Sequence, residues 1–308
     1  MSAGSSLIPL AELGVVRARG TDALSFLQGQ LSCDVGRLSH EHSLLAGYHN
    51  PQGRVIALLR LLKLGADDVA LVLPRELIPA VVQRLTKFVL RAKVKLSDDS
   101  AAWQSHGLVG PDTPPPAGAA DPPPLPQELQ ASAPLGAGWV TRIAVTSARW
   151  LVLSPAGPLP AALAVLPTGA AGEWQRLAVA DGEPQVYAAT SEEFVAQMLN
   201  LDVLGAIAFD KGCYTGQEVI ARAHYRGRVK RRLQRFAART PPPAPGSTLE
   251  LTDGRSAKVV AAIAVAGGGS EFLAVTTLAG ESAESSAAAA AAARLAAQQL
   301  PLPYALPA

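Results

Sequence analysis

At 308 residues, the chain is long enough for two or three domains with hydrophobic cores of their own. It contains no run of about eighteen apolar residues that would cross a membrane, and its N-terminus lacks a basic segment followed by a long apolar one. We therefore expect neither a membrane anchor nor a secretory signal. The two cysteines are too few for a disulfide scaffold, a zinc module or an iron–sulfur cluster held by this chain alone, and they fit a reducing cytoplasm.

The net charge of +2 conceals one strongly basic segment. Residues 211–239 contain nine lysines and arginines but a single acid, so this segment carries +8 and the rest of the chain −6. Such a segment can attract phosphates or an acidic partner, but cations along a strand edge also prevent edge-to-edge pairing, and both interpretations stay open. The cations proposed for weak contact with tRNA are Arg222, Arg226, Arg228, Lys230, Arg231 and Arg232.

The N-terminal third of the chain alternates strands and helices without a regular βαβ order, which predicts an α+β fold. Thr21 is expected to cap a helix that continues to Leu31, with Leu24 and Leu27 on its apolar face. A second helix is expected over residues 75–91, where apolar residues recur at helical spacing. Strands are expected at residues 13–19, 44–49, 54–64, 68–73, 94–96 and around 108, with a hairpin turn at 50–53.

The rest of the chain begins with residues 111–126, where eight prolines in sixteen residues predict an extended surface loop. A helix is expected over residues 173–179, and the alanine-rich residues 284–299 are predicted to be helical as well. Strands are expected at residues 140–145, 150–153, from 229 onward, and at 249–251, 258–265 and 272–277. The last three of these strands predict a small barrel or sandwich.

The most informative segment has the sequence KGCYTGQE and is centred on Cys213. Thr215 and Glu218 have the Thr-x-x-Glu spacing of a capping box, which predicts a helix that begins at about Gly216. Cys213 would then lie near the positive end of that helix, two residues from Lys211. Comparable settings lower a cysteine pKa from about 8.5 to between roughly 3.5 and 7.5, which favours a reactive thiolate. The alternative is a small buried cysteine in a turn.

The sequence around Cys213, FDKGCYTGQEVIAR, closely resembles the signature of the YgfZ family. The resemblance continues upstream in FLQGQL with Asp34 and in the turn at residues 50–54, and downstream in YRG, KR and, near the C-terminus, LPY. Members of this family are folate-binding relatives of the glycine-cleavage T-protein, associated with iron–sulfur protein maturation and with tRNA modification. The matches follow the expected order over most of the chain.

This resemblance implies a T-protein-like multidomain α+β fold around a central folate cavity, with a C-terminal β-barrel. Residues 1–228 would form the folate-binding region, with two interleaved α+β subdomains, and residues 229–308 the barrel domain with the alanine-rich helix. The implied cofactor is tetrahydrofolate or a derivative. The family's folate-contacting tryptophan corresponds to Trp174, whose indole can stack on a pterin or aminobenzoyl ring, although helix core is the alternative. A second aromatic contact of some relatives corresponds to Leu13, which weakens stacking on that side.

Roles follow for the residues of the cysteine segment. Cys213 is the expected reacting group, and Lys211 would keep its thiol ionised. Gln217 would hydrogen-bond a ligand, whereas Arg222 either pairs with Glu218 four residues earlier or contacts the ligand itself. The residues expected to hold the turn in shape are Gly212, Tyr214, Thr215, Gly216 and Glu218.

The function implied by the resemblance is that of a folate-binding accessory factor for the assembly or repair of iron–sulfur enzymes, including those that modify tRNA. Iron–sulfur client proteins are the expected partners. The T-protein uses a carboxylate beside the folate nitrogen, but the turn at residues 50–54 contains no Asp or Glu, so we expect no aminomethyltransferase activity. A folate-dependent one-carbon transferase and a tRNA-binding module remain alternatives.

The remaining candidate groups carry no expected chemistry. Cys33 follows the apolar face of the first helix and is predicted to be a buried, inert thiol. His40 and His42 lack a third ligand nearby, so no metal site is expected.

Overall fold

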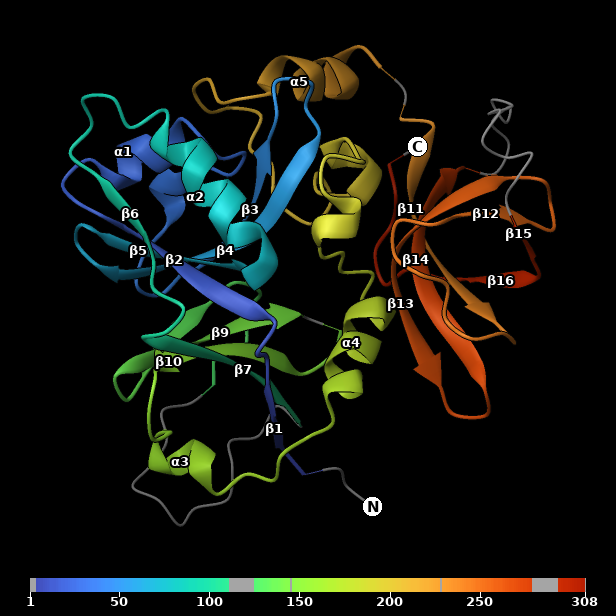
Figure 1. Cartoon of the computed structure of the whole chain (residues 1–308), viewed down its shortest axis with the longest axis horizontal. Coiled ribbons are helices and arrows are strands. Elements are labelled where there is room, and N and C mark those ends of the chain that lie inside the picture. The colour runs from blue at the N-terminus through green and yellow to red at the C-terminus, as the bar shows by residue number, and fades with distance from the viewer. Residues whose placement is uncertain (1–3, 111–124, 145, 228, 279–292, 308) are drawn as a thin grey trace. The chain divides into compact units, whose positions relative to one another are not determined.

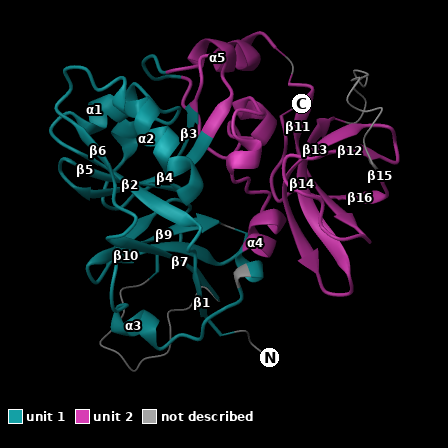
Figure 2. Cartoon of the chain, in the orientation of Figure 1, with its two compact units in different colours: residues 1–48, 57–174, 210–214 teal, residues 49–56, 175–209, 215–308 magenta. Residues whose placement is uncertain are grey.

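A computed structural model describes residues 4–110, 125–144, 146–227, 229–278 and 293–307 (Figure 1). The chain divides into two compact units, shown in Figure 2. Unit 1 comprises residues 1–48, 57–174 and 210–214, and unit 2 comprises residues 49–56, 175–209 and 215–308. The proline-rich loop predicted at 111–126 lies almost entirely outside the described residues.

Unit 1 is built mainly on two five-stranded sheets with the strand orders β1-β7-β10-β9-β8 and β3-β4-β5-β2-β6. Strands β7 and β9 both pair antiparallel with β10, and β5 and β6 both pair antiparallel with β2. The first sheet consists of β1 (Ser6–Pro9), β7 (Trp103–Val109), β8 (Ser132–Leu135), β9 (Gly138–Ala144) and β10 (Arg149–Pro155). The second consists of β2 (Leu13–Arg19), β3 (Leu44–His49), β4 (Val55–Gly65), β5 (Asp68–Pro74) and β6 (Lys95–Asp98).

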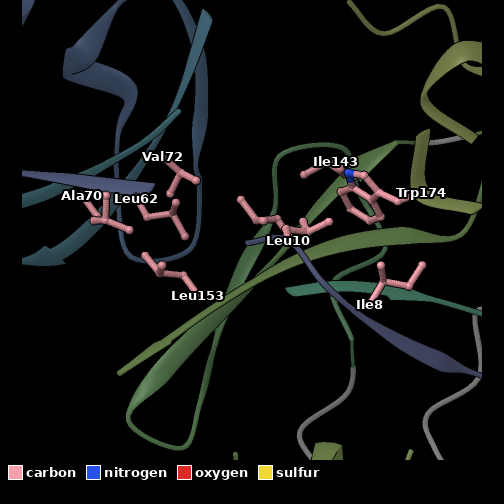
Figure 3. Close-up of a cluster of buried hydrophobic side chains, with 10 residues drawn as sticks. Ile8, Leu10, Leu62, Ala70, Val72, Ile143, Leu153 and Trp174 are labelled. Carbon is pink, nitrogen blue, oxygen red and sulfur yellow. The ribbon is translucent and has the colours of Figure 1, made fainter. Parts of the chain in front are cut away.

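The core of unit 1 contains side chains from both sheets, and strand β10 shows why the first sheet is buried on both faces. Because side chains alternate along a strand, Leu151 and Leu153 join one apolar cluster while Trp150 and Val152 join another. The first cluster, part of which is drawn in Figure 3, also takes residues from the second sheet and from helix α4 (Ala171–Ala180). Its buried members are Ile8, Leu10, Val15, Leu62, Ala70, Val72, Ile143, Leu151, Leu153 and Trp174.

Two predicted helices of unit 1 are present but shorter than expected. Helix α1 covers Ala23–Gln28 and has Asp22, not Thr21, at its N-cap, without a side-chain cap. The second helix, α2, covers Ile78–Thr86 and ends before Leu90, whose φ of 37° takes the chain out of helical geometry. The other short helices are η1 (Val35–Arg37), η2 (Arg75–Leu77) and α3 (Ala161–Ala164).

Unit 2 contains helix α5 (Gln217–Tyr225), the short helices η3 (Ala188–Thr190) and η4 (Ala196–Leu199), and a six-stranded, nearly closed barrel-like sheet. The strand order of this sheet is β15-β12-β13-β14-β11-β16. Phe236 and Phe272 stack in its core with ring centroids 5.4 Å apart. The strands are β11 (Arg231–Ala238), β12 (Thr248–Leu251), β13 (Ser256–Val265), β14 (Gly269–Thr277), β15 (Ala293–Leu295) and β16 (Ala297–Leu300).

The helix predicted for residues 284–299 is wrong where the structure describes it. Residues 293–300 instead form β15, which pairs parallel with β12, and β16, which pairs antiparallel with β11. The strand edges of the sheet offer backbone hydrogen-bond partners, and this tertiary pairing overrides the intrinsic helix preference of alanine. Residues 279–292 lie outside the described part of the chain.

The predicted α+β class and the C-terminal barrel-like sheet are confirmed, and the strands expected at residues 140–145 and 150–153 are present as β9 and β10, which pair antiparallel. Strands β1 and β8 and helix α3 were not predicted, because four residues carry too little periodicity to stand out. Among the described helices, none combines the length and the apolar character needed to cross a membrane.

Candidate functional site around Cys213

Cys213 lies in an irregular loop just before α5, and its side chain is exposed. The neighbouring Gly212 is open as well, since a Cβ added there would meet no heavy atom within 4 Å. The alternative of a buried cysteine in a turn is therefore wrong, and a partner or substrate can reach the thiol.

Lys211 fastens this loop to the end of helix α1. Its ammonium donates to the backbone carbonyls of Gln28, Leu31 and Cys33 at 2.7, 2.8 and 2.7 Å. A lysine has three N–H donors, so these carbonyls use all of them and none is left for the Cys213 thiol. Burial lowers the pKa of Lys211, while the nearby Cys33 and Asp34 act in the opposite direction. The role that the hydrogen bonds support for Lys211 is structural.

The segment that receives Lys211 is held by its own side chains. Gln28 is the last residue of α1, and its amide nitrogen donates to Asp34 Oδ1 at 3.0 Å. Its amide oxygen accepts the backbone N–H of Val35 at 2.6 Å, and Asp34 also accepts the N–H of Gly36 at 3.1 Å. Two parts of the sequence, 183 positions apart from Gln28 to Lys211, are thereby joined within unit 1.

Two further side chains beside the loop are buried. Tyr214 is 7% exposed, its ring lies 5.2 Å from the Lys211 ammonium, and burial raises the pKa of its hydroxyl to about 12. Burial also raises the pKa of the Cys33 thiol to about 12, so at neutral pH this group is a protonated, inaccessible thiol as predicted. Tyr214 and Lys211 thus anchor the loop on both sides of Cys213.

Helix α5 begins where the sequence predicted, but the predicted capping box is absent. The N-cap is Gly216 with a φ of 83°, and no side chain caps the helix, so Thr215 and Glu218 do not play the expected roles. A Cβ at Gly216 would lie 2.6 Å from the carbonyl oxygen of Asn50, so only glycine allows this approach. Among the described residues, Glu218 and Arg222 form no ion pair, and both are exposed.

The turn that packs on Gly216 is organised by the side chain of Asn50. Its amide oxygen accepts the backbone N–H groups of Gln52 and Arg54, both at 3.0 Å, and its amide nitrogen donates to Glu192 Oε2 at 2.7 Å. Glu192 has a φ of 61°, an uncommon conformation for a residue with a side chain. The turn contains no Asp or Glu of its own, but the carboxylate of Glu192 contacts it. Because Glu192 is 142 positions from Asn50, no local sequence signal could reveal this contact.

Trp174 lies in helix α4 and belongs to the apolar cluster drawn in Figure 3. It is only 9% exposed. Its ring packs directly on Gly107, where an added Cβ would lie 2.3 Å from the indole Cε3 atom. The guanidinium carbon of Arg149 lies 5.0 Å from the indole centroid. In this structure the indole is a core side chain with little surface left for a ligand, so stacking of a folate on Trp174 is not favoured by its surroundings and stays a prediction.

The other predicted ligand contacts, Gln217 and Arg222, lie in the first two turns of α5. Gln217 is half-buried and Arg222 is exposed, so both can present polar groups. Within the described residues, no three His, Cys, Asp or Glu side chains come together as a metal site would require.

The basic segment is less exposed than its sequence indicated. Arg232 is 3% exposed and forms a bidentate ion pair with Asp202, with N–O distances of 3.0 and 2.8 Å. Its surroundings do not favour the predicted contact with tRNA, because the guanidinium is buried and already paired. Arg231 is half-buried and donates to the carbonyl of Val275. The exposed cations of the proposed set are Arg222, Arg226 and Lys230, and Arg228 lies outside the described residues.

Known proteins resemble this chain in two ways, in sequence and in fold. The chain is 30% identical over 245 residues to the tRNA-modifying protein YgfZ of Vibrio vulnificus, covering 79% of this chain and 73% of that protein. It is 32% identical over 264 residues to the protein of the same name from Edwardsiella ictaluri, covering 82% and 78%. No protein-family model matches the chain.

Among solved structures, the glycine cleavage system aminomethyltransferase T from Bartonella henselae aligns with a TM-score of 0.65. The alignment covers 90% of this chain and 79% of that protein at 15% sequence identity. At this identity the match shows the fold: the chain has the architecture of the T-protein.

Proposed function

Because the chain belongs to the YgfZ family, we propose that it is a folate-binding accessory factor in tRNA modification that serves iron–sulfur enzymes through the thiol of Cys213. The relatives from Vibrio vulnificus and Edwardsiella ictaluri are named tRNA-modifying proteins, and the fold of the chain is that of the T-protein, which supports a relation to folate. The observation that carries the proposal is the exposed Cys213 on a loop that Lys211 holds in place.

The chemistry proposed for Cys213 is sulfur exchange with a partner. Its thiolate attacks the outer sulfur of a persulfide, a new S–S bond forms on Cys213, and the donor's thiolate leaves as the old S–S bond breaks. Electrons balance without an external oxidant or reductant. Exposure decides which cysteine reacts, since Cys33 is buried and Cys213 is not.

Tetrahydrofolate is proposed as the cofactor on the strength of the fold, and it would supply a carrier for one-carbon groups. Of the chain's own residues, Gln217 and Arg222 offer polar groups for its recognition. Trp174 fits the role less well because it is 9% exposed. Calorimetric titration of tetrahydrofolate into wild type and Trp174→Ala separates the possibilities: lost binding in a variant that unfolds like wild type places the ligand at the indole, and unchanged binding assigns Trp174 to the core.

The test of the thiol is complementation of a bacterial strain that lacks its own YgfZ protein. Cys213→Ala should fail to restore tRNA modification while it unfolds at the wild-type temperature, and Cys33→Ala is the matched control that should complement. Alkylation of the native protein should label one fast thiol, which Cys213→Ser removes. A Cys213→Ala protein that complements fully would show that the thiol is not used.

A folate-dependent one-carbon transferase is the second candidate, favoured by one observation. The Glu192 carboxylate hydrogen-bonds Asn50 in the turn where the sequence lacks an acid. Steady consumption of 5,10-methylenetetrahydrofolate with an added acceptor, lost in Glu192→Gln, would support turnover. No consumption above the buffer rate leaves the accessory role.

A further inference from the structure

Three aromatic rings of unit 2 meet at the C-terminal half of α5. Phe209 and His224 stack with centroids 3.7 Å apart and an interplanar angle of 15°. Tyr225 lies edge-on to both, with centroids 6.1 Å from Phe209 and 4.7 Å from His224. Tyr225 is nevertheless 68% exposed, so the other two rings hold it without covering it. A tyrosine that served only to pack the helix end would be expected to bury more of its ring.

The charges around this aromatic cluster are mostly positive. Arg222 lies three positions before Tyr225, which brings their side chains to neighbouring places on the helix surface. Arg226 follows Tyr225 directly in the sequence. Both arginines and Lys230 are exposed, and none has an ion-pair partner within the described part of the chain. Glu218 is the one acid of α5.

We infer that Tyr225 is a stacking site for an unpaired nucleobase of RNA, with Arg222 and Arg226 at the adjacent phosphates. Single-stranded RNA is recognised by aromatic rings on which bases stack and by cations along the backbone, and this surface offers both. The inference rests on the proposed role in tRNA modification, which supplies the RNA, but it requires neither folate nor Cys213. A stacking site also differs from a site that recognises charge alone, because an exposed ring would add nothing to the binding of duplex phosphates.

The test is fluorescence anisotropy with a labelled, unmodified tRNA transcript and with a short unstructured RNA, each compared with a duplex. Tyr225→Ala should weaken binding of the two RNAs by about 5- to 100-fold, as removal of one base–aromatic stack does, whereas Tyr225→Phe should keep the affinity. Phe88→Ala is the matched control, because Phe88 is 50% exposed and follows Lys87, yet it belongs to unit 1. Arg226→Gln should reduce the salt dependence of binding by about 0.7 in logarithmic slope, and Lys87→Gln should leave it unchanged.

Two results would overturn the inference: wild-type protein that binds neither RNA at low salt, and Tyr225→Ala protein that binds within about twofold of wild type. The first would leave the surface to an acidic protein partner. Neither result bears on the thiol, because Cys213→Ala is predicted to keep RNA affinity while it loses complementation. Failure of the stacking site and failure of the proposed function are therefore distinguishable.

Discussion

Replacing Lys211 with methionine tests whether this residue fastens the cysteine loop or acts in the chemistry of Cys213. Methionine keeps an unbranched apolar side chain but removes the three N–H groups that reach Gln28, Leu31 and Cys33. If the role is structural, Lys211→Met loses stability. If Lys211 served only to support the thiolate, stability would be unchanged and only function would fall.

The magnitude follows from the three hydrogen bonds. A hydrogen bond to a charged group contributes roughly 1.5–3 kcal/mol, but the variant also avoids the cost of desolvating the half-buried ammonium of Lys211. We therefore expect a net loss of about 2–4 kcal/mol in the free energy of unfolding, well below the sum of three bonds. Lys211→Arg should recover only part of it, since a planar guanidinium does not direct its donors as an ammonium does.

Urea denaturation followed by circular dichroism gives the free energy, with Lys87→Met as the control at an exposed lysine. Alkylation of Cys213 in the folded state should still proceed in Lys211→Met, because the thiol is exposed in any case. A Lys211→Met protein within about 0.5 kcal/mol of wild type would refute the structural role, because changes of that size are typical of surface sites.

Two further predictions concern buried charge. Burial lowers the pKa of His49 from 6.5 to about 3, so below about pH 6.5 the unfolded chain binds a proton that the folded chain does not. Because of this residue, the free energy of unfolding should fall by up to about 1.4 kcal/mol for each unit by which the pH decreases. The variant His49→Phe should flatten that slope when urea denaturation is measured over a series of pH values. Arg232→Met leaves Asp202 unpaired and should cost about 3–5 kcal/mol by thermal unfolding, whereas adding Asp202→Leu should restore much of the loss and Arg231→Met should cost less.

The parts of the fold that could be predicted are those with a local signal. Apolar segments between turn residues predicted most strands of unit 1. The Thr-x-x-Glu spacing of Thr215 and Glu218 predicted the start of α5, although neither side chain caps the helix. The same local reasoning failed where local propensity competes with tertiary pairing. Alanine favours a helix in isolation, but residues 297–300 gain backbone partners on β11 and form a strand.

The position of the candidate cysteine in an accessible loop could be predicted from the sequence, but the contacts that hold this loop could not. Its flanking glycine and lysine marked Cys213 as unusual, and its exposure is confirmed. The burial of Arg232 was not predictable, because it depends on Asp202 thirty positions earlier and on a sheet that buries one face of β11. For the same reason, the hydrogen bond between Asn50 and Glu192 could not be predicted from the sequence, because these residues are far apart along the chain.

The contacts of Lys211 show a limit of a more general kind. Its three partners are backbone carbonyls, and every residue of the chain carries one, so no choice of side chain at positions 28, 31 or 33 signals the contact. Only the path of the chain brings them together. The consequence for function is also physical: a thiol on a loop that is already fixed loses little conformational freedom when it meets a partner, whereas a thiol on an untethered loop must first be ordered. In the proposed function, Lys211, two residues before Cys213, would therefore act through the backbone by setting where the sulfur is presented.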